Sequence, residues 1–239
     1  MPAKRKELED KLRAAERLGY VGGMVSKLAH ELRNPLNTIS VNLQLLEEDC
    51  AKINDGKILK RLQISRTEIN RLEHLLSDFL RFARPVSMDL KPLDINEIIT
   101  GFIEFINPTA EKDKVQIVAH LGEKLSPILL DEKLFKSALL NLTLNAIAAM
   151  PKGGTLTFRT RQRKDRILLT ITDTGKGIST EQLTKVFDVF YTTKEGGSGL
   201  GLPITRRIIE DLGGSITLDS TERAGTTVII SLPVTELES

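Results

Sequence analysis

The sequence predicts an α+β protein, in which a helical hairpin that dimerises into a four-helix bundle is followed by an α/β two-layer sandwich of helices on a mixed sheet. Apolar residues recur every seven positions in the first third of the 239-residue chain, which is typical of packed helices. Apolar and polar residues alternate in several short segments of the remainder, which is typical of strands. The two patterns do not overlap, so they indicate two domains.

The seven-residue pattern predicts two long helices joined by a short turn. The first covers residues 8–48, with a regular repeat over about four heptads. Asp55-Gly56 is a turn signal, and a second helix with the same spacing covers residues 62–83 and ends at Arg84-Pro85. Such a hairpin cannot bury its wide apolar stripe alone, so we expect it to dimerise.

The second half of the chain has shorter elements of mixed type. The stretch "RPVSMDLKPLD" indicates a linker, which gives a hairpin domain over residues 1–86, a linker over 87–93 and a second domain over 94–239. We expect helices over residues 96–110, 134–150 and 203–212, and strands over residues 115–121, 127–130, 155–162, 166–173, 215–220 and 226–233.

Charge and composition exclude several classes of function. The 34 basic and 32 acidic residues nearly balance, so we expect neither a nucleic-acid partner nor a basic stripe that binds membranes. Cys50 is the only cysteine, so no intrachain disulfide forms, which fits a reducing compartment. The chain has no run of 18 apolar residues and no signal pattern. We expect no membrane segment in it, and either a cytoplasmic protein or the cytosolic portion of a larger one.

The stretch "LAHELRNPLN" (residues 28–37) places a candidate nucleophile in the first helix. His30 occupies the outward f position of the heptad, and Asn34 lies one turn later on nearly the same face. An exposed neutral imidazole is a competent nucleophile, and Glu31 is placed to accept its ring proton. Pro35 removes a helical hydrogen bond and costs about 3 kcal/mol. The residues alone leave open a solvated histidine beside a tolerated kink, whereas a zinc site would need a second histidine at the position of Asn34.

This stretch resembles the H box of two-component sensor histidine kinases, in which H-E-x-x-N-P surrounds the phospho-accepting histidine. The resemblance implies that His30 accepts a phosphoryl group and that Glu31 assists the transfer. It implies that Asn34 positions the water, or the aspartyl-phosphate of the partner, in a reverse phosphatase reaction. It also implies a homodimer, a response-regulator receiver domain as partner, and a cytoplasmic protein or the cytosolic portion of a membrane-anchored sensor.

Two glycine-rich motifs in the second half indicate a phosphate-binding site, although the chain contains neither a Walker A motif nor G-x-G-x-x-G. "TDTGKGI" (residues 172–178) follows an apolar strand, and "GGSGLGL" (residues 196–202) leads into a helix. Glycines let backbone N–H groups approach an anion, and a helix start adds the positive end of a dipole. Asp173 is placed to accept from an amine such as that of adenine. Either motif alone is more often an ordinary turn.

The helix over residues 134–150 carries two amides on one face. Asn141 and Asn145 are four residues apart beside an otherwise apolar surface. One role for such amides is to hold Mg²⁺ through an oxygen and a bridging phosphate. A pair of satisfied core amides is the other reading that the residues allow.

Together these motifs resemble the ATP-binding domain shared by histidine kinases, Hsp90-type chaperones and MutL-type repair ATPases. The resemblance implies ATP and Mg²⁺ as cofactors, Asn145 as the metal ligand, and a lid over residues 178–197 that contains "FDVFYTTK" (residues 187–194). Many members carry Lys or Arg where this chain has Ala148, so Lys194 and Lys152 are candidates to neutralise the phosphates. The nucleotide-binding residues implied are Asn141, Asn145, Asp173, Gly175, Gly177, Lys194, Gly197, Gly199, Leu200, Gly201 and Thr226.

The predicted function is ATP-dependent autophosphorylation on histidine, phosphoryl transfer to an aspartate of a response regulator, and phosphatase activity toward that partner. The main alternative is a non-catalytic phosphotransfer or scaffold protein with a degenerate ATP domain, which the intact Asn145, Asp173 and glycine motifs disfavour. An aspartic protease built on Asp173-Thr174-Gly175 conflicts with the helical surroundings. A serine kinase of the same ATPase superfamily would have no use for the H box.

Overall fold

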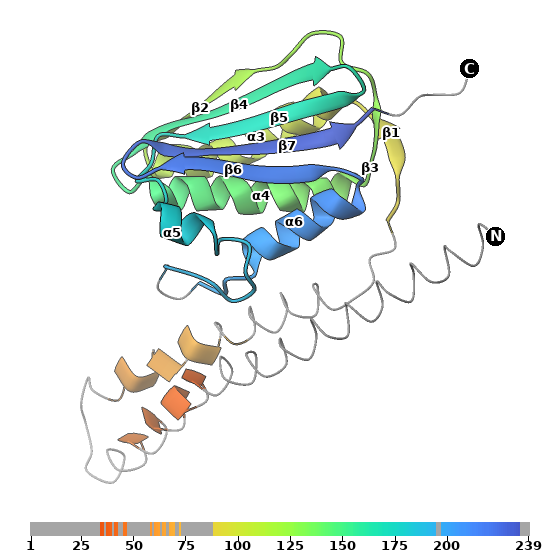
Figure 1. Ribbon diagram of the computed structural model, residues 1–239. Coiled ribbons are helices and arrows are strands. Elements are labelled where there is room, and N and C mark those ends of the chain that lie inside the picture. Colours follow the sequence, from red (N-terminus) through yellow and green to blue (C-terminus); the bar gives the residue numbers. More distant parts are fainter. Residues whose placement is uncertain are drawn as a thin grey trace, which may run out of the picture. The chain divides into compact units, whose positions relative to one another are not determined.

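The computed structural model describes residues 88–194 and 197–234, and, in the N-terminal third, residues 34–35, 37–39, 41–42, 45–46, 58, 60–62, 64–65, 67–69 and 72 (Figure 1). The chain divides into two compact units. The first consists mainly of residues 1–85, and the second consists of residues 86–192 and 199–239.

The described residues between positions 34 and 72 are all helical, which confirms the predicted helices where they are described; residues 58, 60 and 61, before the predicted start of the second helix, are helical as well. Within the first helical segment, Thr38 Oγ1 donates to the carbonyl oxygen of Asn34 at 3.2 Å. Arg61 is helical, directly before the predicted second helix, and donates from a guanidinium nitrogen to the carbonyl oxygen of Leu45 at 3.3 Å. This bond holds the two helical segments against each other, as in a hairpin. The predicted turn at residues 55–56 lies outside the described residues.

The second unit alternates helices and strands along the chain. In order, its elements are β1 (Lys91–Leu93), α3 (Ile95–Lys112), β2 (Val115–His120), β3 (Ile128–Leu130), α4 (Glu132–Ala149), β4 (Gly154–Arg163), β5 (Arg166–Asp173), α5 (Thr180–Leu183), α6 (Gly201–Asp211), β6 (Ser215–Thr221) and β7 (Gly225–Pro233). The expected helices and strands of this unit are all present, with ends shifted by at most two residues.

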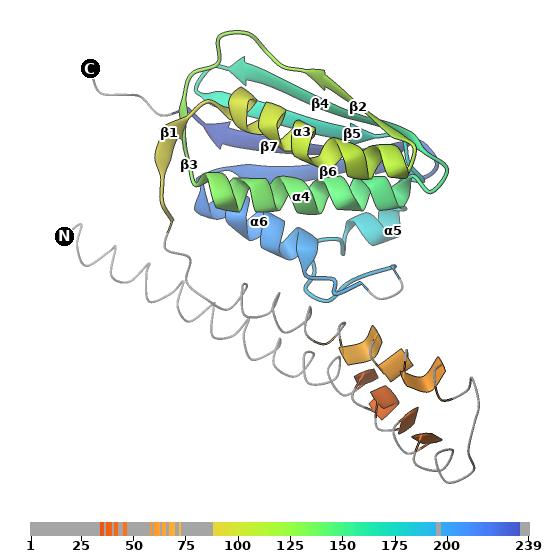
Figure 2. The same cartoon turned by 180° about the vertical axis from the view of Figure 1, so that it is seen from behind.

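Five strands form one mixed sheet in the order β2-β4-β5-β7-β6. Strands β2 and β4 are parallel, and the other neighbours are antiparallel. Helices α3, α4 and α6 lie together on one face of this sheet (Figures 1 and 2). The unit is therefore a two-layer α/β sandwich, which confirms the predicted fold class.

The core lies between the sheet and the helices. Alternate residues of β5 are buried, beginning with Ile167, and each fully buried aliphatic side chain stabilises the fold by roughly 1.5–3 kcal/mol. Phe102 of α3 meets Phe158 of β4 edge to face, with ring centroids 6.4 Å apart. The last buried position of β5 is Asp173. The same alternation that fills the core therefore turns one carboxylate inward at the end of a strand.

The structure differs from the prediction at two short elements. Residues 91–93, assigned to the linker, form β1 and pair antiparallel with β3. The four-residue helix α5 lies within the segment predicted as a lid. Neither element has the length or the alternation that a sequence pattern requires, because β1 has only three residues, one of them a proline, and α5 is a single turn.

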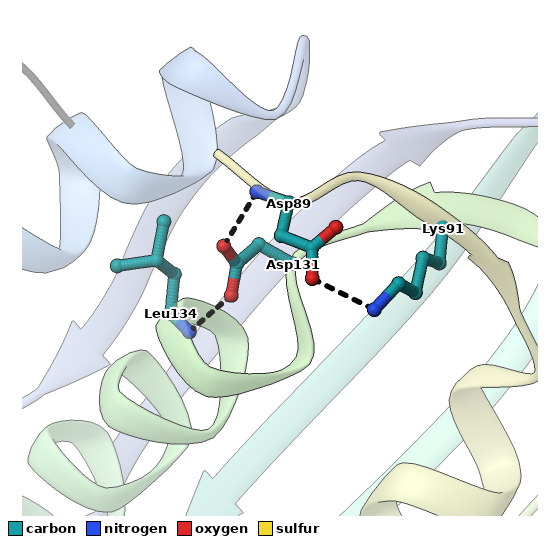
Figure 3. A network of polar contacts seen from close by, with 4 residues as sticks. All are labelled: Asp89, Lys91, Asp131 and Leu134. Atoms are coloured by element: carbon teal, nitrogen blue, oxygen red, sulfur yellow. Dashed lines mark hydrogen bonds and ion pairs between the residues drawn. The ribbon is translucent and has the colours of Figure 1, made fainter. Parts of the chain in front are cut away.

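Asp131 links the backbone at Asp89, just before β1, to the start of α4 (Figure 3). Its Oδ1 accepts from the N–H of Leu134 at 3.1 Å, as the N-cap of α4, and its Oδ2 accepts from the N–H of Asp89 at 3.0 Å. Burial opposes the charge of this carboxylate, but N–H donors from Asp89, Leu134 and Lys133 hold the pKa of Asp131 below its ordinary value. Lys91 also pairs with the Asp89 side chain at 2.7 Å, on the exposed surface, where ion pairs contribute little.

Candidate functional site

Asp173 is a buried carboxylate at the end of β5, with 6% of its surface exposed. Its Oδ1 accepts from the backbone N–H of Gly175 at 2.8 Å and of Thr226 at 3.3 Å. Thr226 stands directly opposite Asp173 on the neighbouring strand β7. Burial raises the pKa of Asp173 above its ordinary value, and these two N–H donors act in the opposite direction. The carboxylate is thus fixed in position by the backbone on both sides.

The first glycine motif folds back onto backbone carbonyl groups that leave no space for a side chain. Gly177 has a φ of +65°, and a Cβ there would overlap the carbonyl oxygen of Thr221. Gly225, in the turn before β7, has a φ of +98°, and a Cβ there would overlap the carbonyl oxygen of Asp173 itself. These glycines therefore allow chain segments to approach each other around the carboxylate.

The second glycine motif leads directly into α6. Gly199 has a φ of +65°, and its carbonyl oxygen accepts from the N–H of Phe190 at 3.0 Å, which closes the end of the lid segment. The buried Leu200 stands at the N-cap and provides no side-chain hydrogen bond, so α6 begins at Gly201 without a side-chain cap. An uncapped helix start offers its first backbone N–H groups and its positive dipole end to an anion.

The two amides of α4 are linked to each other and to α6. Asn141 Nδ2 donates to Thr205 Oγ1 at 2.7 Å. Asn145 Nδ2 donates to Asn141 Oδ1 at 3.5 Å. Both amides are half-buried, and Gly201 packs directly on the side chain of Asn141.

The described residues do not bring every predicted site residue together. Asn34 is an exposed helical residue of the first unit, while His30 and Glu31 lie outside the described residues. Lys194 and Gly197 belong to the segment 193–198, outside the second unit, where the N–H of Gly197 donates to the carbonyl of Lys194 at 3.2 Å. The second unit brings the others together in two groups. Asp173, Gly175, Gly177 and Thr226 lie around the end of β5 and the turn between β6 and β7. Asn141, Asn145, Gly199, Leu200 and Gly201 lie along α4 and at the start of α6.

Two residues of the site were missed in the sequence. Thr205 accepts the hydrogen bond from Asn141. Ser220 Oγ accepts from the N–H of Ile178 at 2.9 Å and donates to the carbonyl of Gly225 at 2.8 Å, so it joins the first glycine motif to the turn before β7. Thr205 could have been recognised in the sequence, because it follows Gly201 of the second glycine motif by one helical turn. No sequence pattern indicates Ser220.

Three observations test whether these residues fit a nucleotide and Mg²⁺. Among the described residues, none donates a hydrogen bond to Asp173 Oδ2, so this oxygen is left to accept from an exocyclic amine. The uncapped start of α6 suits phosphate. No group of three or more His, Cys, Asp or Glu that could hold a metal ion occurs in the described part of the chain. An amide oxygen together with phosphate oxygens is a ligand set that Mg²⁺ accepts, so the site fits both.

Two family models match the chain in succession. The model described as "His Kinase A (phospho-acceptor) domain" matches residues 21–87, and the model described as "Histidine kinase-, DNA gyrase B-, and HSP90-like ATPase" matches residues 130–236. The sensor histidine kinase ZraS of Salmonella typhi is 34% identical over 230 residues, which are 96% of this chain and 49% of ZraS. The chain therefore spans about half the length of this relative.

Two solved structures are similar over most of the chain. The histidine kinase ThkA, in complex with the response regulator TrrA, has a TM-score of 0.80 and 26% identity, over 98% of this chain and 67% of ThkA. Full-length ShkA, in complex with AMPPNP, has a TM-score of 0.66 and 25% identity, over 90% of this chain and 46% of ShkA. In the part of the chain that the structure describes, no helix is long and apolar enough to span a bilayer. Both family models and these relatives show that the chain belongs to the two-component sensor histidine kinases and carries their phosphoacceptor and ATP-binding domains.

Proposed function

We propose that this chain transfers the γ-phosphoryl group of ATP to His30, passes it to an aspartate on the receiver domain of a response regulator, and also dephosphorylates that partner. The observation that carries the proposal is Asp173, a buried carboxylate whose Oδ1 is held by two backbone N–H groups and whose Oδ2 accepts no hydrogen bond from the described residues. The AMPPNP in ShkA and the response regulator bound to ThkA support both halves of the proposal.

The ATP-binding unit holds the nucleotide from three sides. Asp173 accepts from the exocyclic amine of adenine. The start of α6 binds phosphate oxygens through its backbone N–H groups, and Asn145 supplies an amide oxygen to Mg²⁺, which neutralises phosphate charge when it is bound. The remaining residues proposed to line or shape this site are Asn141, Gly175, Gly177, Lys194, Gly197, Gly199, Leu200, Gly201 and Thr226.

The transfer itself is mainly a matter of positioning. A ring nitrogen of His30 attacks the γ-phosphorus, the bond from this phosphorus to the bridging oxygen breaks, and ADP leaves with the electron pair. Glu31 accepts the ring proton. A carboxylate oxygen of the regulator then attacks the phosphorus of phosphohistidine, and the electron pair of the P–N bond returns to the ring. In the phosphatase reaction, Asn34 orients the water that attacks the phosphorus of the aspartyl-phosphate, and the regulator's carboxylate and inorganic phosphate are released.

We propose that the hairpin dimerises. Leu62 and Ile69 lie seven residues apart on one line of the heptad pattern, and 49% and 45% of their surfaces are exposed within one chain, as is 55% of Val41. Packing against a second copy removes this apolar surface from water. The proposed assembly is a homodimer, either cytoplasmic or the cytosolic portion of a membrane-anchored sensor. We propose domain boundaries at residues 1–86 and 94–239, and no nucleic-acid partner.

Labelling with ATP tests the proposed reaction. Wild-type chain incubated with γ-labelled ATP and Mg²⁺ should acquire label that is labile in acid and stable in base, and His30→Ala should acquire none while it binds ATP normally. His120→Ala is the matched control, because His120 is an exposed histidine on β2 and should leave labelling unchanged. Equal labelling of His30→Ala would refute the assignment. ATP binding without any label on the wild type would favour the scaffold alternative.

A further inference from the structure

A row of arginines lies on the face of the five-stranded sheet that the helices leave open. Arg159, Arg161 and Arg163 are exposed residues at alternate positions of β4, so their side chains point to the same face. The intervening Phe158 packs on Phe102 of α3, which places the helices on the other face (Figure 1). We propose that this arginine row binds an extended acidic segment of a partner protein, with carboxylates at every second residue. The proposal goes beyond the phosphotransfer reaction and does not depend on it.

The arginine row has no counter-charge within the part of the chain that the structure describes. None of its guanidinium groups forms an ion pair or a hydrogen bond with a described residue, and Asp165, in the turn after β4, forms no ion pair with them. Among the outward positions of the five strands, Asp219 of β6 is the only acidic residue, and β6 lies three strands away from β4. Three like charges side by side repel one another, and an anionic partner relieves this repulsion.

Arg166 has a structural role on the same face, and its surroundings differ from those of the row. It stands opposite Arg163 on β5 and is half-buried. Its Nε donates to Ser231 Oγ at 2.7 Å, and its Nη2 donates to the carbonyl oxygen of Gly213 at 3.3 Å. These bonds join β5 to β7 and to the turn before β6. The exposed arginines of the row make no comparable bond, so the packing of this unit does not explain them.

Protection of a strand edge does not explain the row either. Strand β2 pairs with β4 only as far as Arg159, so the last part of β4 would be an open edge, and charged residues at such edges prevent aggregation. The chain before β3 already covers this edge. The N–H of Gly122 donates to the carbonyl oxygen of Thr160 at 3.1 Å, and the N–H of Ser126 donates to the side chain of Gln162 at 2.8 Å.

The spacing of the arginine row matches an extended polypeptide. Alternate residues of a strand are about 6.6–6.8 Å apart, and the same distance separates carboxylates at every second residue of an extended segment. Each guanidinium can hold a carboxylate through two parallel hydrogen bonds. Leu168, opposite Arg161 on β5, and Ile229 on β7 are half-buried on the same face. They offer apolar surface to the methylene groups of glutamate side chains.

Two other classes of anionic partner fit this face less well. Proteins that bind single-stranded nucleic acid stack its bases on aromatic side chains, and no outward position of the five strands carries Phe, Tyr or Trp. Helices that bind a membrane surface insert apolar side chains below the headgroups. None of the exposed large apolar side chains of the described residues lies on the open face of this sheet. A protein partner that supplies carboxylates is therefore favoured.

Two labelled peptides of the same composition test the proposal. One alternates glutamate and threonine (ETETETE), and the other has its four glutamates first (EEEETTT). Binding is measured by fluorescence anisotropy at low ionic strength. The wild type should bind the alternating peptide more tightly, by about twofold or more, because it presents more carboxylates on one side. Replacing the row by glutamine (Arg159→Gln, Arg161→Gln and Arg163→Gln together) should weaken this binding by about tenfold, as expected for three exposed ion pairs.

Matched variants separate the row from net charge. Replacing Lys112, Lys114 and Lys133 together by glutamine also removes three exposed positive charges, but none from a strand of the sheet. This control should bind the alternating peptide like the wild type. Replacing the row by lysine keeps its charge but removes the paired hydrogen bonds, so it should restore only part of the affinity. An equal loss in the lysine-to-glutamine control, or equal binding of the two peptides by the wild type, would overturn the proposal.

Anionic competitors decide the class of partner. Vesicles of phosphatidylserine and phosphatidylcholine in equal parts, and oligothymidine, are titrated in the same buffer. Tighter binding of either than of the alternating peptide would overturn the assignment to a protein partner. If circular dichroism shows that the triple glutamine variant does not fold, Arg161→Gln alone is measured and should weaken peptide binding by about twofold; unchanged binding would overturn the proposal. No measurement uses ATP, so the result is independent of the proposed reaction at His30.

Discussion

Replacing Asp173 by Asn tests how the chain selects its nucleotide. The amide oxygen of Asn can keep the bonds from Gly175 and Thr226 to Oδ1, which are 2.8 and 3.3 Å long. An NH₂ group then stands where Oδ2 would accept from adenine. A hydrogen bond to a charged group contributes about 1.5–3 kcal/mol, so we expect ATP affinity to fall roughly 10- to 150-fold at 1.4 kcal/mol per factor of ten.

The assay is calorimetric titration with ATP and with inosine triphosphate, in which a carbonyl replaces the exocyclic amine. The wild type should prefer ATP, and Asp173→Asn should lose or reverse this preference because its NH₂ group donates to the carbonyl. The free energy of unfolding should not fall in Asp173→Asn, because burial disfavours the charged carboxylate that the substitution removes. Asp219→Asn removes an exposed charge on β6 and is the control. Unchanged ATP affinity, or the same loss for both nucleotides, would refute the contact.

Three further predictions concern glycine, capping and pH. Gly225→Ala should lower the free energy of unfolding in urea by about 1–3 kcal/mol, because the φ of Gly225 is +98° and a Cβ would overlap the Asp173 carbonyl. Gly101→Ala is the control: a Cβ at Gly101 in α3 meets nothing within 4 Å, so this change should raise the free energy of unfolding by about 0.5–1 kcal/mol. Equal effects of the two substitutions would contradict this reasoning. Asp131→Ala should lower the free energy of unfolding by about 0.5–2 kcal/mol, because it removes the N-cap of α4 and also the acceptor for the N–H of Asp89. The pKa of Asp131 in the folded chain lies below 3.8, so the wild type has this stabilisation above pH 3.8 and should lose it in acid denaturation curves as the pH falls further. The pKa of Asp173 in the folded chain lies above 3.8, so ATP affinity should decline on acidification while the pH is still above 3.8. Over the same interval the free energy of unfolding of the nucleotide-free chain should rise, because the folded state binds the proton more tightly than the unfolded state. Asp173→Asn should show neither change, and the same pH profile in the variant and the wild type would exclude Asp173 as the cause.

The order of elements in the second unit was predictable because its patterns are long. The alternation in β5 sets both the strand and the inward direction of Asp173, and the 18-residue α4 was recognisable by its length and its end before Pro151. Strand β1 could not be predicted, because its three residues become a strand only by pairing with β3, which lies more than thirty residues further along the chain. Short elements of this kind depend on tertiary partners rather than on local preference.

The candidate site was predictable in composition but not in detail. Glycines at positions 177 and 199 were expected to bring backbone N–H groups to phosphate, whereas in the structure the space beside them is filled by the backbone of Thr221 and Phe190. These two glycines therefore allow two backbone segments to pack closely against each other. The bond from Asn141 to Thr205 spans 64 residues of sequence, and no spacing rule within a single helix could indicate it.

The bond from Asp89 to Asp131 shortens the tether between the two units. The predicted linker ended at residue 93, but the backbone is already fixed at Asp89, four residues earlier. At roughly 3.3–3.6 Å per extended residue, four residues correspond to about 14 Å of lost span. If the proposed transfer to His30 takes place, the reach of the second unit would be set by the residues before Asp89, and lengthening that stretch would be a direct way to change it.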